Sequence, residues 1–167
     1  MISSIKCSIC LDVMVEAVAL RCGHSFCQMC LDDAINVDDR CPECRRHSNG
    51  ILIPNLRLND CIYHILRGNT SQLNDFHRRR IQNRIVMSIR REARAVLFSI
   101  LHESKRALSR VEIEDQWKTL RHMESFPEML RSEMIRIVRS SPKIFEVTVE
   151  NSEERVALKS FAQEGRR

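Results

Sequence analysis

The sequence predicts an α+β fold in two parts: a small cysteine-rich module, then a long helix and a mostly helical module that ends in a β-hairpin. Three observations lead to this prediction. Seven of the eight cysteines lie within the first 44 residues. Apolar residues then recur at helical spacing between residues 81 and 101. Near the end of the chain, the segments 143–149 and 155–158 partly alternate apolar and polar residues, as β-strands do.

Length and composition indicate a chain that folds and does not cross a membrane. The chain has 167 residues, of which 43% are hydrophobic and 29% are charged, so it can bury a core. It has no stretch of about 18 apolar residues, so we expect no membrane span. Lys6, Cys7 and Asp12 interrupt the only segment that resembles a secretory signal. We therefore expect an intracellular protein of the nucleus or cytoplasm, where clustered cysteines bind metal more often than they form disulfides.

The cysteines of the first module, with one histidine, form four pairs with the spacing of metal ligands. Eight ligands are enough for two tetrahedral zinc sites. A closed tetrahedral shell leaves no position for water, so we expect both ions to be structural. They would also supply the folding energy that a module of about 40 residues cannot obtain from apolar burial alone. The eight ligands are Cys7, Cys10, Cys22, His24, Cys27, Cys30, Cys41 and Cys44.

At these residues the sequence resembles the RING finger family in its three-Cys, one-His, four-Cys form, over about residues 5–47. The resemblance implies a cross-brace, in which alternate pairs share an ion, although the spacing alone also permits sequential pairing. In the cross-brace the first zinc takes Cys7, Cys10, Cys27 and Cys30, and the second takes Cys22, His24, Cys41 and Cys44. The eighth cysteine, Cys61, lies outside the motif on the apolar face of an expected helix. We expect it to be a small core residue.

The resemblance also implies a ubiquitin ligase. Such a ligase docks a ubiquitin-conjugating enzyme and holds the charged thioester in a reactive conformer, without a covalent intermediate. Two apolar positions, Ile9 and Pro42, match the family's docking surface. Ile35, or Ala34 in a register one residue shorter, matches a third position where many active RINGs carry tryptophan. The groove therefore stays apolar but loses aromatic area. Whether the modifier is ubiquitin or a relative such as SUMO stays open.

Arg45 follows the last zinc ligand directly and matches the family's linchpin arginine. Its planar guanidinium group can hydrogen-bond carbonyl groups of ubiquitin and of the conjugating enzyme at the same time. Alternatively, Arg45 only offsets the negative charge of the zinc–thiolate cluster. Because Ile9, Pro42 and Arg45 occur together, we predict Arg45 as the catalytic residue. The apolar filling around the zinc sites is expected to be Leu11, Val13, Val18, Leu20, Phe26 and Leu31.

Beyond residue 50, which ends the first module, the pattern becomes helical. Residues 51–72 hold a short helix and a linker, and residues 73–167 begin with a long amphipathic helix, either single or two helices joined end to end. Ser109 and Glu112 form a capping-box pattern for a following helix, and Pro127 suits the first turn of another. The polar run 150–154 then predicts a hairpin loop.

Three helices and a hairpin, over about residues 93–160, have the element order of a winged helix. The closing segments 141–147 and 155–159 weakly resemble winged-helix modules of the LOTUS type, which bind helicases or RNA. Trp117 falls on the second of these helices, and we expect it to belong to the core.

Positive charge is concentrated on the long helix. Residues 51–110 carry 12 basic and 4 acidic side chains, whereas both flanking sections are slightly acidic. Two zinc ions on seven thiolates lower the net charge from +5 to +2, so the basic character is local. We expect the exposed face of this helix, including Arg90, to be solvated, as basic helix faces usually are. Aromatic residues that could stack on bases are nearly absent from it, with only Phe76 at its edge, which argues against nucleic acid. The candidate contacts for nucleic acid or a partner are Arg78, Arg79, Arg80, Arg84, Arg131, Arg136 and Arg139.

Together these observations predict a RING-type ubiquitin ligase whose C-terminal module recruits a protein substrate or partner. The segment from Ile81 to Ile89 is the candidate surface for a homodimer or another partner. One alternative is a RING that assembles a protein or RNA–protein complex without enzymatic activity. The other is a nucleic-acid-binding winged-helix protein with a structural RING.

Overall fold

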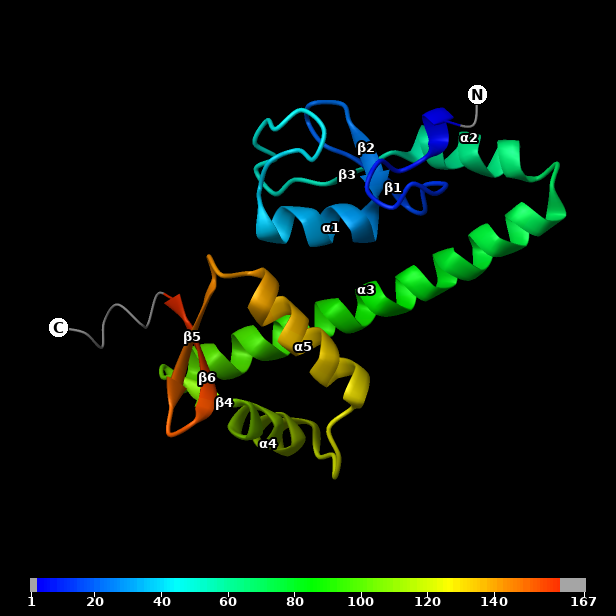
Figure 1. Cartoon of the computed structure of the whole chain (residues 1–167). Helices are drawn as coiled ribbons and strands as arrows, with labels where there is room; N and C mark the ends of the chain where they lie inside the picture. Colours follow the sequence, from blue (N-terminus) through cyan, green and yellow to red (C-terminus); the bar gives the residue numbers. More distant parts are fainter. Residues whose placement is uncertain (1–2, 160–167) are drawn as a thin grey trace. The chain divides into compact units, whose positions relative to one another are not determined.

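The computed structural model describes residues 3–159 and divides the chain into two compact units, with the boundary along the chain between Met87 and Ser88. Each unit has its own apolar core. The expected α+β class is confirmed, because both units combine helices with a small sheet (Figure 1). Within the described range, none of the helices has the length and hydropathy that a membrane crossing requires.

The first unit contains a three-stranded antiparallel sheet with the order β2-β1-β3. Its strands are β1 (Ala17–Ala19), β2 (Ser25–Cys27) and β3 (Ile53–Pro54). A short 3₁₀ helix (Ser3–Ile5) precedes the sheet, and α1 (Gln28–Val37) follows β2 directly. Phe26 and Leu31 are fully buried, as predicted. Leu11 is 74% exposed, so its assignment to the apolar filling is wrong.

Helix α2 (Leu56–Leu66) is fixed to the sheet by two asparagines. The side chain of Asn55 caps the helix by accepting a hydrogen bond from the Leu58 amide. The side chain of Asn59 bonds both backbone groups of Ala17 in β1, accepting at 2.7 Å and donating at 3.2 Å. The buried face of α2 carries Ile62 and Leu66. Cys61 is exposed, so its expected place in the core is wrong; the polar anchor at Asn59 and the burial of Ile62 turn the cysteine outward.

Helix α3 (Thr70–Ser104) is a single helix of 35 residues. This settles the choice between one helix and two, and the helix begins three residues before the expected Leu73. Leu73 and Phe76 pack against the core of the first unit. From Ser88 onward α3 belongs to the second unit, where Val96, Leu97 and Ile100 are core residues.

In the second unit a three-stranded sheet has the order β4-β6-β5. Strand β5 (Phe145–Glu150) pairs with β6 (Glu153–Leu158) over all six residues, and β4 (Leu108–Ser109) pairs with the other edge of β6. The hairpin loop is only Asn151 and Ser152, both with positive φ, as in a type I′ turn. The expected loop 150–154 is therefore too long, and Glu153 and Glu154 lie in a strand.

Helices α4 (Arg110–Arg121) and α5 (Glu128–Ser140) complete the second core. The predicted capping box is confirmed: Ser109 accepts from the Glu112 amide, and the Glu112 carboxylate accepts from the Ser109 amide at 2.7 Å. Trp117 is buried against Phe126, as expected for a core residue. Arg90 is also buried, which overturns its placement on a solvated face; its Nε lies 3.1 Å from Glu133 Oε2 of α5.

Candidate zinc sites and docking surface

Two clusters of sulfur and nitrogen donors lie in the first unit. Within each cluster the ligand atoms all lie within 4.8 Å of one another. The clusters follow the cross-brace and not the sequential pairing. One cluster is Cys7, Cys10, Cys27 and Cys30, and the other is Cys22, His24, Cys41 and Cys44.

The donor separations fit tetrahedral zinc. Four sulfurs at a Zn–S distance of about 2.3 Å lie about 3.8 Å apart along each tetrahedral edge. The Cys10 and Cys27 sulfurs are separated by 3.8 Å, which is far too long for a disulfide. In the second cluster, His24 Nδ1 lies 3.4 Å from the sulfur of Cys22 and 3.7 Å from that of Cys41. Both clusters therefore fit one zinc ion each, with no ligand missing.

Backbone geometry preorganises the two zinc loops in the same way. In the first loop the Leu11 amide donates to the Cys7 carbonyl, and in the second the Arg45 amide donates to the Cys41 carbonyl. Leu11 and Arg45 both adopt the left-handed conformation, with φ of 62° and 61°. Amide-to-sulfur bonds add to this order, as from Val15 to Cys27 at 3.2 Å. The residue after the Cys7-x2-Cys10 pair and the residue after the Cys41-x2-Cys44 pair thus turn away from the metal and toward solvent.

The thiol pKa values depart from their usual range because neighbouring sulfurs compete for protons. Hydrogen bonds with Cys27 and Cys30 lower the pKa of Cys7, whereas hydrogen bonding with Cys30 and Cys7 raises that of Cys27. A backbone hydrogen bond from His24 lowers the pKa of Cys22 to about 6. Such a cluster becomes fully ionised when a divalent cation replaces the protons, so zinc binding releases protons.

Glu43 links the two zinc loops. One carboxylate oxygen accepts a hydrogen bond from the Ser8 hydroxyl at 2.8 Å, and the other lies 3.3 Å from Nε2 of His24. A carboxylate on the second nitrogen of a metal-binding histidine orients the ring and fixes its tautomer. Because Ser8 precedes Ile9 and Glu43 follows Pro42, the same contact holds the two candidate docking loops together. Nothing in the sequence pattern of ligands pointed to Glu43.

The candidate docking residues differ in exposure. Ile9 is 39% exposed and Pro42 is partly buried. Ile35 and Ala34 are both partly buried on α1, and Ile35 packs against the core of the first unit. The Arg45 side chain is 71% exposed, with its Nη1 at 3.7 Å from Asp38 Oδ2. Leu11 adds an exposed apolar side chain two residues from Ile9, and sequence reasoning missed it. Its position could have indicated this exposure, because Leu11 follows Cys10 directly, as Arg45 follows Cys44.

Three arginines of α3 bind the segment that follows the first zinc loop. Arg79 lies 2.8 Å from the Asp12 carboxylate and donates to the Val13 carbonyl at 3.1 Å. Arg80 and Arg84 both donate to Glu16, at 2.6 and 2.8 Å. Partial burial raises the pKa of Glu16, but the hydrogen bonds from Arg80 and Arg84 outweigh it and hold that pKa below its usual value. These arginines, predicted as candidate phosphate or partner contacts, are engaged within the first unit.

The other candidate basic contacts are distributed over both units. Arg78 pairs with Asp75 one turn earlier on α3. In the second unit Arg131 donates to both carboxylate oxygens of Glu114 and lies over the ring of Phe126. Arg136 is exposed and Arg139 lies at the edge of a groove. The predicted arginines are therefore divided between the two units, and most of them pair with carboxylates of their own unit.

Comparisons with known proteins identify the first unit. The family model for "Zinc finger, C3HC4 type (RING finger)" matches residues 6–44. An uncharacterized RING finger protein, T02C1.1 of Caenorhabditis elegans, is 43% identical over 42 residues, which are 25% of this chain and 26% of that protein. The E3 ubiquitin-protein ligase TRIM21 of Bos taurus is 50% identical over 56 residues, 33% of this chain and 11% of that protein. The E3 ubiquitin-protein ligase rnf8 of Danio rerio is 50% identical over 42 residues, which are 25% of this chain and 9% of that protein.

The chain thus spans about a quarter or less of the length of these relatives. The similarity falls on the segment that carries the eight zinc ligands and their cross-brace arrangement. Residues 6–44 of this chain are a RING finger of the three-Cys, one-His, four-Cys type, with two zinc sites, similar to the RING fingers of ubiquitin ligases.

Proposed function

We propose that the chain is a RING-type ubiquitin ligase, acting in the nucleus or cytoplasm, whose first unit docks a ubiquitin-conjugating enzyme. The supporting observation is the contact of Glu43 with Ser8 and His24, which holds the loops of Ile9 and Pro42 side by side. Leu11 and Ile9 give this surface exposed apolar area, which a conjugating enzyme can cover. Ile35 or Ala34 supplies its third apolar position.

In this function Arg45 acts on the thioester without entering a covalent intermediate. The left-handed backbone at Arg45 directs its side chain outward from the second zinc loop. The contact of Arg45 with Asp38 is long, at 3.7 Å, so it competes weakly with other acceptors for the guanidinium group. The guanidinium group is then available to hydrogen-bond ubiquitin and the conjugating enzyme together. Catalysis follows from holding the thioester in one orientation, so no proton-transfer residue is required.

The test is discharge of ubiquitin from a panel of charged conjugating enzymes onto free lysine. The zinc-loaded chain should accelerate discharge from at least one enzyme. Ile9→Ala and Arg45→Ala should abolish the acceleration while zinc content stays at two ions, whereas Arg46→Ala, at an exposed neighbour outside the motif, should retain it. A non-enzymatic assembly role would be favoured if the chain accelerated discharge neither of ubiquitin from any enzyme of the panel nor of SUMO from a SUMO-conjugating enzyme.

Self-association through α3 is part of the proposal. Ile81 and Ile85 lie one turn apart on the helix and are 62% and 46% exposed, respectively. A second copy that covers this pair would bury apolar surface with little desolvation of polar groups. Sedimentation velocity should show a concentration-dependent dimer, and the double substitution Ile81→Ser with Ile85→Ser should shift it to monomer.

The second unit is proposed to recruit the substrate or partner, as a winged-helix-like module. The observation behind this part is the strand order β4-β6-β5, with helices α4 and α5 between the first and second strands along the chain. Arg131, one of the candidate phosphate contacts, is already paired with Glu114, so protein is favoured over nucleic acid as the partner. Loss of the substrate's ubiquitination, with ubiquitin discharge unchanged, is the expected effect of disrupting this unit.

A further inference from the structure

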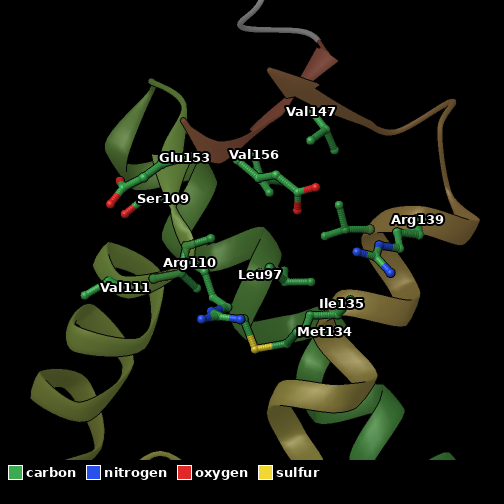
Figure 2. Close-up of a pocket in the computed structure, with 13 residues that line it drawn as sticks. Leu97, Ser109, Arg110, Val111, Met134, Ile135, Arg139, Val147, Glu153 and Val156 are labelled. Carbon is green, nitrogen blue, oxygen red and sulfur yellow. The ribbon is translucent and has the colours of Figure 1, made fainter. Parts of the chain in front are cut away.

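A groove of about 500 Å³ opens in the second unit between α4, α5 and the β5–β6 hairpin. We call it the hairpin groove. Its floor is formed by core residues such as Leu97, Met134 and Val138. Figure 2 shows Val147 and Val156 on the hairpin, facing the α5 side where Ile135 and Met134 lie. A groove of this volume accommodates several large side chains.

The hairpin groove is apolar because the hairpin extends past the core it covers. Alternate residues of β5 share one face, and Phe145, opposite Leu158, is buried in the core. The next pair on that face is Val147 opposite Val156, and both line the groove. Val156 packs partly against the core, whereas Val147 is 45% exposed. Val111 at the start of α4 is 57% exposed at the other side of the groove. The unit therefore presents uncovered aliphatic side chains around an existing hollow.

Charges of both signs flank the hairpin groove. Arg139 of α5 and Glu153 of β6 lie on opposite sides of it in Figure 2. Glu154 also lines the groove and adds a second carboxylate on the hairpin. Within residues 3–159, none of these three side chains forms an ion pair. Their charges are thus available to an occupant, and two carboxylates on the hairpin disfavour a phosphate backbone there.

We propose that the hairpin groove binds an apolar segment of a partner protein. The segment inserts two or more bulky aliphatic or aromatic side chains between Val147 and α5. It carries an acidic residue toward Arg139 and a basic residue toward Glu153 and Glu154. This inference rests on the proposed recruiting role of the second unit and names the site and the chemistry of what is recruited.

The test uses random 12-residue peptides displayed on phage and selected against the full-length, zinc-loaded chain. The enriched peptides should combine bulky apolar residues with an acidic residue at one end and a basic residue at the other. For the best peptide, Val147→Asp should weaken binding about tenfold or more, because it places a charge in the apolar groove. Val149→Asp is the matched control: it lies on the same strand and face, is 70% exposed, and does not line the groove.

Reversal of one charge tests the polarity of the hairpin groove. Selection against Arg139→Glu should replace the acidic residue of the enriched peptides by a basic one. Trp117 fluorescence, which reports on the second core, should be the same in all variants. Failure to enrich any peptide, or equal loss with Val149→Asp, would overturn the proposal. The proposal would also be overturned if the unmodified chain bound a labelled 12-nucleotide RNA and Arg139→Glu abolished that binding. None of these readouts uses ubiquitin transfer, so an inactive RING and an empty groove are distinguishable results.

Discussion

Arg79 of α3 forms an ion pair with Asp12, which lies two residues after the zinc ligand Cys10, at 2.8 Å. The same guanidinium group donates to the carbonyl of Val13. The Arg79 side chain is 26% exposed, so water screens the pair only in part. The helix thereby fixes the end of the loop that carries Ile9 and Leu11. The proposed docking loop of the RING is thus held by the zinc cluster at one end and by an arginine outside the RING motif at the other.

We expect Arg79→Ala to weaken docking of the conjugating enzyme while both zinc ions stay bound. The loop then keeps its two cysteine ligands but loses the contacts that fix its far end, so more conformations must be ordered on binding. A several-fold rise in the concentration of conjugating enzyme needed for half-maximal discharge is the expected result. Arg78→Ala is the control, because Arg78 pairs with Asp75 on its own helix and, among the residues the structure describes, with no other carboxylate. Equal effects of the two substitutions would show that the ion pair with Asp12 has no positioning role.

Removal of zinc should unfold the first unit and leave the second unit folded. The first unit has two metal clusters within its core, so loss of the ions removes much of its folding free energy. The second unit has a separate apolar core that contains Trp117, the only tryptophan of the chain. A chelator should release two zinc ions per chain and reduce the circular dichroism signal, with little change in Trp117 fluorescence. A simultaneous loss of both signals would contradict the independence of the two cores.

Sequence reasoning found the features that depend on residues close together in the chain. The eight ligands, the capping box of Ser109 and Glu112, and the core position of Trp117 are of this kind. It missed the features that arise only from folding. Strand β4 is two residues long and exists because β6, more than 40 residues later, pairs with it.

The errors have the same origin. Arg90 is a charged residue on an arginine-rich helix, and its burial depends on partners from distant segments, such as Glu133 of α5. Leu11 is apolar, but it directly follows the zinc ligand Cys10 and its own backbone is left-handed, which directs its side chain to solvent. In the hairpin, Asn151 was a turn signal that the run of acidic residues obscured, so the loop was predicted too long.

We expect Glu133→Ala to destabilise the second unit by about 3–5 kcal/mol, because it removes the carboxylate that pairs at 3.1 Å with the buried guanidinium group of Arg90. Urea unfolding followed by Trp117 fluorescence measures this change. The control is Glu92→Ala, which removes an exposed pair with Arg121 and should cost about 0–1 kcal/mol. Replacing both partners, Arg90→Met with Glu133→Leu, should recover most of the lost stability. If the single and double variants were equally unstable, loss of packing rather than loss of the ion pair would be the cause.

Acid should weaken the second unit through Glu112. A hydrogen bond from Arg106 and another from the Ser109 amide lower the pKa of Glu112 from 4.5 to about 2, and Arg155 adds to the effect. Because the folded pKa is the lower one, this contribution to the free energy of unfolding is fully present above about pH 4.5. It is lost as the pH falls through about 2. The carboxylate is partly exposed, so salt should reduce the contribution. The free energy of unfolding of Glu112→Gln, followed by Trp117 fluorescence, should depend less on pH across this window than that of the unmodified chain. Identical pH profiles for the two proteins would show that another carboxylate dominates the acid response.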